Sequence, residues 1–257
     1  HYHRLMERKG ITPSAAKAVL RSRSTVIGAL MVERGEADAM IAGVVGRFQR
    51  KLQYCQEIVG IEPDLEAPAA MSAIACDRGT FFFLDTYVNQ DPSANELCVA
   101  TIMAVERLKV FGIQAKVALL SHSNFGSEDS VSSRKMRKVL ELLRIRAPQL
   151  EVEGEMHADA ALNATIRERL FPNSRLTGSA NMFVFPNLDA ANICFNMVRV
   201  LTGGVSLGPI VMGLKKPCYV LTNSATVRRV INMTALAVVE AQVRQRQAEA
   251  ATEALRL

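Results

Sequence analysis

Apolar runs of strand length alternate along this chain with longer segments whose apolar positions recur at helical spacing. The runs expected to form strands span residues 37–43, 71–76, 80–84, 116–120, 181–186 and 218–221. Helices are expected at the start of the chain, at 13–20, at 25–34, around 50–53, from 93 to 112, up to 201, and from 225 almost to 257. Strands that alternate with helices predict an α/β fold with mainly parallel sheets.

Local signals mark the ends of several of these elements. Thr12 followed by Pro13 is typical of an N-cap and the first residue of a helix. Ser93 with Glu96 three residues later has the pattern of a capping box. Residues 77–79 read Asp-Arg-Gly between two apolar runs, which predicts a hairpin turn.

Residues 208–217 contain two glycines and two prolines, which predicts a tight turn that exposes backbone. A strand is expected at 218–221, and Thr222, Ser224 and Thr226 then precede the last helix. A strand, a polar loop and a helix N-terminus together suit an anionic group such as phosphate. A plain strand, turn and capped helix explains the same residues, and spacing alone does not choose between the two.

Composition narrows the class of protein. The chain has 257 residues, 49% hydrophobic and 22% charged, as expected for a soluble globular protein. No apolar run is long enough to cross a bilayer, and we expect no secretory signal. Five cysteines without a CxxC pair and four unclustered histidines predict reduced thiols, a cytoplasmic location and no metal site.

The net charge of +6 has two interpretations. It is a solvated basic surface, or it serves a polyanionic ligand such as a coenzyme A nucleotide. We do not expect nucleic acid as a partner, because no known module and no basic run interleaved with aromatics is present.

The sequence GPIVMGLKKP at 208–217, followed by VLTNSATVRRVIN at 220–232, resembles the C-terminal part of phosphate acetyltransferases. The closer resemblance is to the phosphotransacetylase-like domain of bacterial hybrid malic enzymes. Active phosphate acetyltransferases carry Ser-Arg-Gly in this loop and an Asp several residues later. Here the matching positions hold Thr222, Asn223, Ser224 and Arg229. The resemblance therefore implies that the loop is kept and its chemistry is lost.

A second resembling segment is Ser121-His122-Ser123-Asn124-Phe125-Gly126-Ser127, where the family has a Lys in place of Phe125. Small hydroxyl residues around a glycine after a strand can present backbone N–H groups to a phosphate; a polar strand-to-helix loop is the alternative. Glu128 and Asp129 would repel an anion, so we expect Arg134 and Lys135 to matter there.

At other positions, too, this chain differs from the phosphate acetyltransferases. The Arg-Pro pair of the acetyltransferases is Gln53-Tyr54 here, and a further active-site Arg falls on Met6. Residues 153–161 and 181–192 resemble two more family segments. In the first, Glu155, His157 and Asp159 suggest a metal or acid/base cluster, but we expect cleft lining and a helix start. In the second, Asn181 and Asn192 orient a ligand or satisfy buried backbone.

The resemblance implies two α/β lobes of the phosphotransacetylase and isocitrate-dehydrogenase-like type, with a cleft between them. One lobe is expected to be discontinuous, from residues 1–64 and 212–257, and the other to span 65–211. It also implies that the chain is a fragment with a malic enzyme domain upstream. That domain would use NADP and Mg²⁺ or Mn²⁺ for its oxidoreductase chemistry, and we expect no cofactor in this fragment.

The leading hypothesis is a non-catalytic regulatory module that binds acetyl-CoA as an allosteric effector. The alternatives are an active phosphate acetyltransferase and a scaffold domain that serves only oligomerisation. We assign no catalytic and no metal-binding residue. The candidate ligand-binding residues are Ser121, His122, Ser123, Asn124, Gly126, Ser127, Asn181, Thr222, Asn223, Ser224, Thr226, Arg228 and Arg229.

A homodimer or larger homo-oligomer is expected, as in the family. The segment 230–243 is apolar on more than one face, whereas a surface helix needs only one apolar stripe. A partner subunit or the lobe's own core would cover the surplus. The apolar positions are Ile231, Met233, Leu236, Val238, Val239 and Val243.

Overall fold

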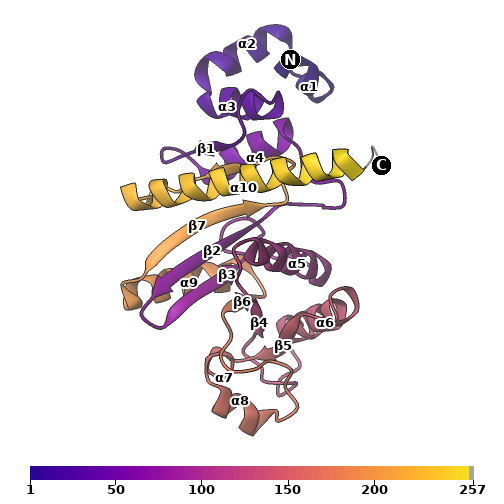
Figure 1. Ribbon diagram of the computed structural model, residues 1–257, viewed down its shortest axis with the longest axis vertical. Coiled ribbons are helices and arrows are strands. Elements are labelled where there is room, and N and C mark those ends of the chain that lie inside the picture. Colours follow the sequence, from indigo (N-terminus) through magenta and orange to yellow (C-terminus); the bar gives the residue numbers. More distant parts are fainter. Residues whose placement is uncertain (255–257) are drawn as a thin grey trace. The chain divides into compact units, whose positions relative to one another are not determined.

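The computed structural model describes residues 1–254 (Figure 1). The chain forms two compact units. Unit 1 consists of residues 1–64 together with the segment from Gly213 onward, and unit 2 consists of residues 65–212.

Unit 1 builds its helices around two short parallel strands. Strands β1 (Met40–Ala42) and β8 (Cys218–Val220) pair in the register Met40 to Cys218 and Ala42 to Val220. The N-cap expected before the second helix is present, because Thr12 Oγ1 accepts a hydrogen bond from Ala15 N at 3.2 Å. The helices are α1 (Tyr2–Met6), the 3-10 turn η1 (Glu7–Lys9), α2 (Pro13–Ser22), α3 (Ser24–Glu33), α4 (Phe48–Ile58) and α10 (Val227–Ala254).

The first strand is shorter and less buried than its sequence predicts. Only residues 40–42 of the expected strand 37–43 pair, and Ile41 and Ala42 are half-buried. The strand ends where Gly43 adopts φ +141° and its backbone approaches Leu221. A Cβ on Gly43 would lie 2.7 Å from Leu221 O, so only glycine fits this close approach.

Unit 2 contains a six-stranded mixed sheet in the order β5-β4-β6-β3-β2-β7. The hairpin expected around 77–79 is confirmed, since β2 and β3 pair antiparallel. The prediction of mainly parallel sheets holds only for the other half, because β2 is antiparallel to both of its neighbours. The strands are β2 (Ala69–Cys76), β3 (Gly79–Leu84), β4 (Lys116–Leu120), β5 (Glu151–Met156), β6 (Met182–Val184) and β7 (Val205–Met212).

The expected turn at 208–217 is wrong for its first half. Gly208 to Met212 belong to β7, which pairs with β2, and only the segment after Met212 turns. Pro209 lacks a backbone N–H but is tolerated, because β7 is an edge strand of the sheet. The register of the pair shifts between Met71 and Ala73, opposite Gly208, which adopts φ +116°. The glycine and proline therefore mark a bulge in a strand.

Helices cover both faces of this sheet, with α5 and α6 on one side and α7, α8 and α9 on the other (Figure 1). The predicted capping box of α5 is present, because Ser93 and Glu96 bond each other's backbone N–H groups. The core on the α9 side is aromatic: Phe83 packs against Phe183, Phe185 and Phe195 at centroid distances of 5.5–6.2 Å. The helices are α5 (Ala94–Val110), α6 (Val131–Arg146), α7 (Ala158–Leu162), α8 (Ala164–Leu170) and α9 (Leu188–Thr202).

One arginine is completely buried in unit 2. The guanidinium of Arg167 in α8 donates to the carbonyl oxygens of Ala160 at 3.0 Å, Leu176 at 2.9 Å and Gly178 at 2.5 Å. Burial lowers the pKa of Arg167, and nearby Glu168, Glu151 and Glu153 partly offset this effect. Arg167 therefore ties α7 and the segment 176–178 to α8.

Within residues 1–254, none of the helices has both the length and the apolar character needed to span a bilayer.

Candidate functional site

The serine loop, residues 121–127, follows β4 as the sequence predicts. Most of its backbone N–H groups are used inside the chain. Asn124 N donates to Ser127 Oγ at 3.0 Å, and Ser127 N donates to Asn124 O at 3.0 Å. Phe125 N donates to Glu155 O at 2.8 Å, and Gly126 N donates to Glu155 Oε1 at 2.9 Å. In this conformation the N–H groups of residues 124–127 are therefore not free for a phosphate, contrary to the expectation for these four groups.

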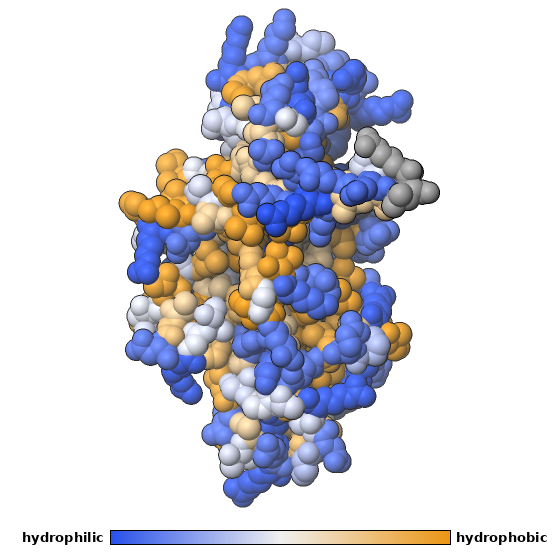
Figure 2. Space-filling view, in the orientation of Figure 1, coloured by the Kyte–Doolittle hydropathy of each residue, from blue (hydrophilic) through white to orange (hydrophobic). Residues whose placement is uncertain are grey.

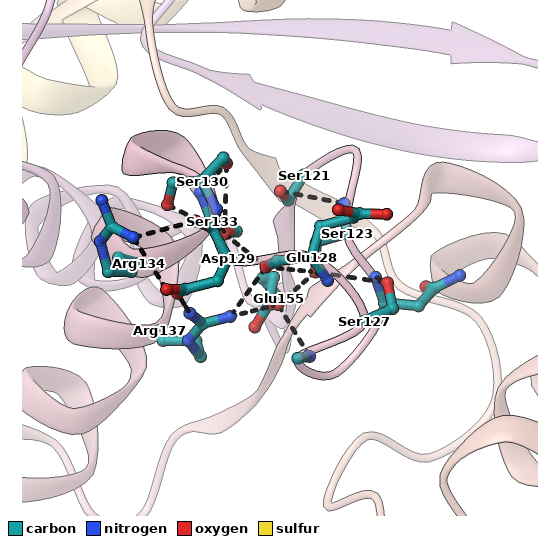
Figure 3. Close-up of polar contacts among 12 residues, drawn as sticks. Ser121, Ser123, Ser127, Glu128, Asp129, Ser130, Ser133, Arg134, Arg137 and Glu155 are labelled. Atoms are coloured by element: carbon teal, nitrogen blue, oxygen red, sulfur yellow. Dashed lines mark hydrogen bonds and ion pairs between the residues drawn. The ribbon is translucent and has the colours of Figure 1, made fainter.

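The Glu155 carboxylate explains this arrangement. It is 1% exposed, and its Oε1 accepts from Ser123 Oγ at 2.7 Å, from Gly126 N at 2.9 Å and from Arg137 Nη1 at 3.0 Å (Figure 3). A buried carboxylate needs several donors to offset the loss of hydration. The chain thus places its own anion among the donors that an external phosphate would use.

Of the two acidic residues after the loop, Asp129 is neutralised by helix α6, but not by the expected pair. Arg134 and Arg137 bind the two carboxylate oxygens of Asp129 at 2.9 and 2.7 Å (Figure 3). Lys135 points elsewhere: it forms an ion pair with Asp91 and donates to the carbonyl oxygens of Pro92 and Pro186. Arg134 lies where it was expected, and the expectation for Lys135 is wrong because successive residues of a helix face different directions.

His157 also forms hydrogen bonds with residues of the serine loop. His157 Nε2 lies 2.7 Å from His122 O, so this nitrogen carries a proton and donates. His157 N donates to Asn124 Oδ1 at 2.8 Å. Phe125, at φ +50°, stacks on Phe171 with a centroid distance of 4.7 Å. These contacts hold the loop in one shape.

The absence of a metal cluster was an expectation from the sequence. Glu155 and His157 have separate partners, and Asp159 Oδ1 accepts from Ala160 N at the start of α7. Within the part of the chain that the structure describes, no group of three His, Cys, Asp or Glu side chains could hold a metal ion.

Asn181 is not brought to the serine loop. Its Oδ1 accepts from Lys116 N at 2.8 Å and its Nδ2 donates to Gln114 O at 2.8 Å. These contacts lie at the start of β4, whereas the serine loop follows the end of that strand. The geometry favours the structural alternative for Asn181, in which the amide satisfies backbone groups.

The threonine loop, residues 222–226, follows β8 in unit 1. Its hydroxyls Thr222 Oγ1 and Ser224 Oγ lie 3.1 Å apart, and both are within 3.5 Å of Arg229 Nη1. Thr226 Oγ1 accepts from Arg229 N at 3.2 Å, as an N-cap does. Arg229 is only 4% exposed, whereas Arg228 is exposed. Arg229 therefore organises the loop from within.

Asn223 connects the threonine loop to the segment after β1. With its amide nitrogen turned toward that segment, Asn223 donates to Val44 O at 2.5 Å and to Gly46 O at 3.3 Å. The loops that follow the two parallel strands of unit 1 are thus held together at one edge of this small sheet. The serine loop belongs to unit 2, so its use with the threonine loop by one ligand stays a prediction.

Sequence reasoning missed the partnership of Arg137 and Glu155. Arg137 stands three residues after Arg134, which places both on one face of α6. That spacing was a usable signal. Glu155 was considered only as part of a metal or acid/base cluster, because nothing local in its sequence shows that it is buried.

Known proteins resemble the chain over almost its whole length. Residues 1–238 match the family described as phosphate acetyl/butaryl transferase. An NADP-dependent malic enzyme of Escherichia coli is 51% identical over 94% of this chain, which spans 32% of that protein. The chain therefore covers about a third of the length of that malic enzyme.

Phosphate acetyltransferases are the next group of relatives. The enzyme of Paracoccus denitrificans is 34% identical, with 92% of this chain and 76% of that protein covered. The solved structure of a phosphotransacetylase from Streptococcus pyogenes aligns with a TM-score of 0.81 at 28% identity, covering 92% of this chain and 72% of that one. The chain belongs to the phosphate acetyl/butaryl transferase family, as a phosphotransacetylase-like domain of the type that hybrid malic enzymes contain.

Proposed function

We propose that this chain is a non-catalytic regulatory domain of a malic enzyme and that it binds acetyl-CoA as an allosteric effector. The parent enzyme would convert malate to pyruvate and CO₂. Its NADP and divalent metal ion would be bound by a malic enzyme domain outside this chain. Identity of 51% to a malic enzyme, against 34% to a phosphate acetyltransferase, supports this choice of parent.

The observation that supports a non-catalytic role is that main polar groups of both loops are already paired within the chain. Glu155 occupies the hydroxyl of Ser123 and the N–H of Gly126, and Arg229 lies on the hydroxyls of Thr222 and Ser224. Acyl transfer requires preorganised donors and cations directed at the charge that develops in the transition state. Groups that stabilise their own loops do not supply this.

Two arguments support acetyl-CoA as the effector: the net charge of the chain and the thermodynamic requirement for allosteric control. A basic chain of net charge +6 is suited to a ligand that carries several phosphates. Acetyl-CoA is made from pyruvate, so feedback on an enzyme that produces pyruvate is sensible. Acetyl-CoA can exert control only if it binds one arrangement of the full protein more tightly than another.

An active phosphate acetyltransferase is the second candidate. Its support is the match to the Paracoccus denitrificans enzyme over 76% of that protein, which shows that the chain has most of such an enzyme's length. Against it stand Gln53 and Met6 at positions where the family carries arginines.

Two measurements on the purified chain separate the possibilities. Calorimetric titration with acetyl-CoA and with free CoA tests binding, and release of acetyl phosphate from acetyl-CoA and inorganic phosphate tests turnover. We expect binding of acetyl-CoA without turnover. Turnover at rates normal for an enzyme would establish the second candidate. Absence of both would leave a scaffold domain that serves only oligomerisation.

We also propose that the chain forms homodimers or larger homo-oligomers in the cytoplasm. The surface of helix α10 supports self-association. The helix buries Met233 and Leu236 and yet leaves Ile231 62% and Val238 49% exposed. Figure 2 shows apolar surface at the N-terminal end of α10, on the left of the view. A symmetric dimer would place the same patch on both chains.

A further inference from the structure

Two segments of unit 1 carry the chain to unit 2 and back, and they pair with each other. The chain passes between the units only twice, after residue 64 and after residue 212. Before the first passage and after the second, segments 60–62 and 213–215 form an antiparallel bridge between Ile61 and Leu214. A backbone hydrogen bond lies on each side of this bridge, at 3.0 and 3.1 Å. We call these two paired segments the crossing ribbon.

Arg244 in α10 binds both segments of the crossing ribbon. Its Nη1 donates to Lys215 O at 2.6 Å and to Glu62 Oε1 at 3.3 Å, and its Nη2 donates to Leu214 O at 3.0 Å. Its Nε donates to Glu240 Oε1 at 3.2 Å, one turn earlier on the same helix. The Glu240 carboxylate is buried, so it fixes the direction in which the guanidinium points.

The part of α10 that carries this contact lies outside the family match. The match to the phosphate acetyl/butaryl transferases ends at residue 238, whereas α10 continues to Ala254. Glu240 and Arg244 both follow residue 238, and the crossing ribbon lies within the match. The extension of α10 therefore adds a contact to segments that belong to the matched part of the chain.

Two explanations fit these contacts. In the simpler one, Arg244 only anchors the end of α10 to unit 1, and the crossing ribbon keeps its shape without it. In the other, Arg244 holds the ribbon together. The geometry favours the second explanation, because three of the four hydrogen bonds of the guanidinium go to the ribbon and reach both of its segments. An anchor would need contact with only one of them.

We propose that the extension of α10 after residue 238 is a latch that restrains the chain where it passes between the two units, with Arg244 as its positioning residue. A change in the arrangement of the units bends the backbone at these passages, because no other part of the chain joins the units. One guanidinium that binds both segments opposes that bending. The latch thereby sets the free-energy difference between arrangements, on which any allosteric control depends. This inference does not depend on the identity of the effector.

The test uses three variants of the full chain. Arg244→Met removes the cation of the latch and keeps a side chain of similar reach. Arg246→Met is the matched control, because it makes the same charge change on the same helix. Arg246 is exposed, and within residues 1–254 its side chain forms no hydrogen bond or ion pair. Arg244→Lys keeps the charge but lacks the planar fork of donors that reaches both segments.

Hydrogen exchange followed by nuclear magnetic resonance reports on the ribbon directly. The amides of Glu62 and Lys215 form its two backbone hydrogen bonds, with Gly213 O and Gly60 O. We expect both amides to exchange about tenfold faster or more in Arg244→Met, since hydrogen bonds to charged groups typically contribute about tenfold or more each. Both should respond by the same factor, because one guanidinium holds both segments.

The amide of Leu221 is the internal control. It donates to Ala42 O at 2.7 Å in the small sheet of unit 1, away from the ribbon. Its exchange should be unchanged in all three variants. Equal acceleration at Leu221 would overturn the proposal, because the substitution would then destabilise unit 1 as a whole. The same conclusion follows if Arg246→Met accelerates the ribbon amides as much as Arg244→Met, since net charge would explain the effect.

Freedom of the units is measured by pulsed electron paramagnetic resonance. Spin labels are attached through Lys17→Cys in unit 1 and Asn173→Cys in unit 2, both exposed. The half-buried Cys76 and Cys194 are first replaced by alanine, and the other cysteines are buried. Labelled chain is diluted with unlabelled chain, so that distances between copies do not contribute. We expect a broader distribution of distances in Arg244→Met than in wild type and in Arg246→Met.

Three results would contradict the latch. Unchanged ribbon amides together with faster exchange in α10 after Glu240 would show that Arg244 only anchors the helix. Acceleration of one ribbon amide alone would show that a single segment is held. An unchanged distance distribution would show that the ribbon does not restrain the units. Arg244→Lys covers the case in which Arg244→Met folds poorly: we expect partial acceleration, and full protection would mean that charge alone suffices without the fork.

Discussion

The guanidinium of Arg137 lies 3.0 Å from the carboxylate of Glu155, at the base of the serine loop. The carboxylate is 1% exposed and the arginine side chain is 33% exposed, so the pair extends from the interior to the surface of unit 2. Arg137 also binds Asp129, which links the loop to the first turn of α6. The shape of the loop therefore depends on a charge that lies outside it.

Removing Arg137 should destabilise the protein strongly. In Arg137→Met the buried carboxylate of Glu155 loses its only cation among the residues described, and breaking such a pair costs about 3 kcal/mol. The measurement is the free energy of unfolding from urea titration. The matched control is Arg134→Met, whose pair with Asp129 is exposed on both sides and contributes less than about 1 kcal/mol. Equal losses in the two variants would show that Glu155 does not need Arg137.

Substitution of Arg229 should destabilise the protein, whereas substitution of the neighbouring Arg228 should not. Arg229→Met removes the contacts of its guanidinium to Thr222 and Ser224, and we expect a loss of about 1–3 kcal/mol in the free energy of unfolding. Arg228 is exposed, so Arg228→Met should change stability by less than about 0.5 kcal/mol. Thermal unfolding of both variants measures this. A stable Arg229→Met protein would mean that the loop is held by its hydroxyls alone.

That difference bears on the expectation that Arg228 or Arg229 contributes charge to acetyl-CoA binding. Arg228→Glu tests it without disturbing the loop, and we expect a loss of about 1–3 kcal/mol in binding free energy if the residue contacts a phosphate. Unchanged affinity in both Arg228→Glu and Arg229→Glu would remove these residues from the ligand site.

Gly154 should be less replaceable than another glycine of the same sheet. Gly154 and Gly79 both have positive φ, at +152° and +125°, so alanine is strained at either position. Only at Gly154 would the added Cβ also meet a neighbour, because it would lie 2.7 Å from Leu119 O. We expect Gly154→Ala to lower the midpoint of thermal unfolding clearly more than Gly79→Ala. Equal shifts would mean that β4 and β5 move apart at Gly154 without loss of stability.

Self-association should depend on the exposed apolar positions of α10. Ile231→Asp places a charge in the proposed contact and should convert oligomers to monomers in light scattering at tens of micromolar protein. Ile145→Asp in α6 is the control, since Ile145 is 77% exposed and lies outside that helix. A wild-type chain that is already monomeric at this concentration would assign oligomerisation to another part of the full protein.

The thiol of Cys55 should resist alkylation as the pH rises. A hydrogen bond with Cys218, together with burial, raises the pKa of Cys55 well above that of a free thiol. A raised pKa lowers the fraction of reactive thiolate at every pH below it. We expect mass spectrometry after treatment of the native protein with iodoacetamide at pH 8.5 to find Cys76, which is half-buried, modified before Cys55. Early modification of Cys55 would indicate local opening of unit 1.

The sequence predicted the helices of this chain better than its strands, and the reason is local chemistry. Thr12 and the pair of Ser93 and Glu96 specify helix starts through contacts within a few residues, and the structure contains these contacts. Gly208 and Pro209 also have a strong local preference for a turn. It is overridden because β2, far away in sequence, provides a pairing partner that accepts a bulge.

The candidate site was less predictable, because its main contacts are between residues distant in sequence. Hydroxyls and a glycine after a strand indicate a loop that can hold an anion. Nothing in that segment shows that Glu155, from the next strand, occupies the donors of the loop. In the same way, the exposed position of Arg228 and the buried position of Arg229 follow from how α10 packs, and neighbouring letters of the sequence do not distinguish them.

Arg167 has a consequence for how unit 2 opens to solvent. Its three carbonyl acceptors belong to α7 and to the segment 176–178, which lie on either side of α8 in the sequence. If either segment detached alone, a charged group in the interior would lose acceptors that water cannot replace there. We therefore expect the two segments and α8 to exchange their amide hydrogens as one cooperative unit, with a common free energy of local opening.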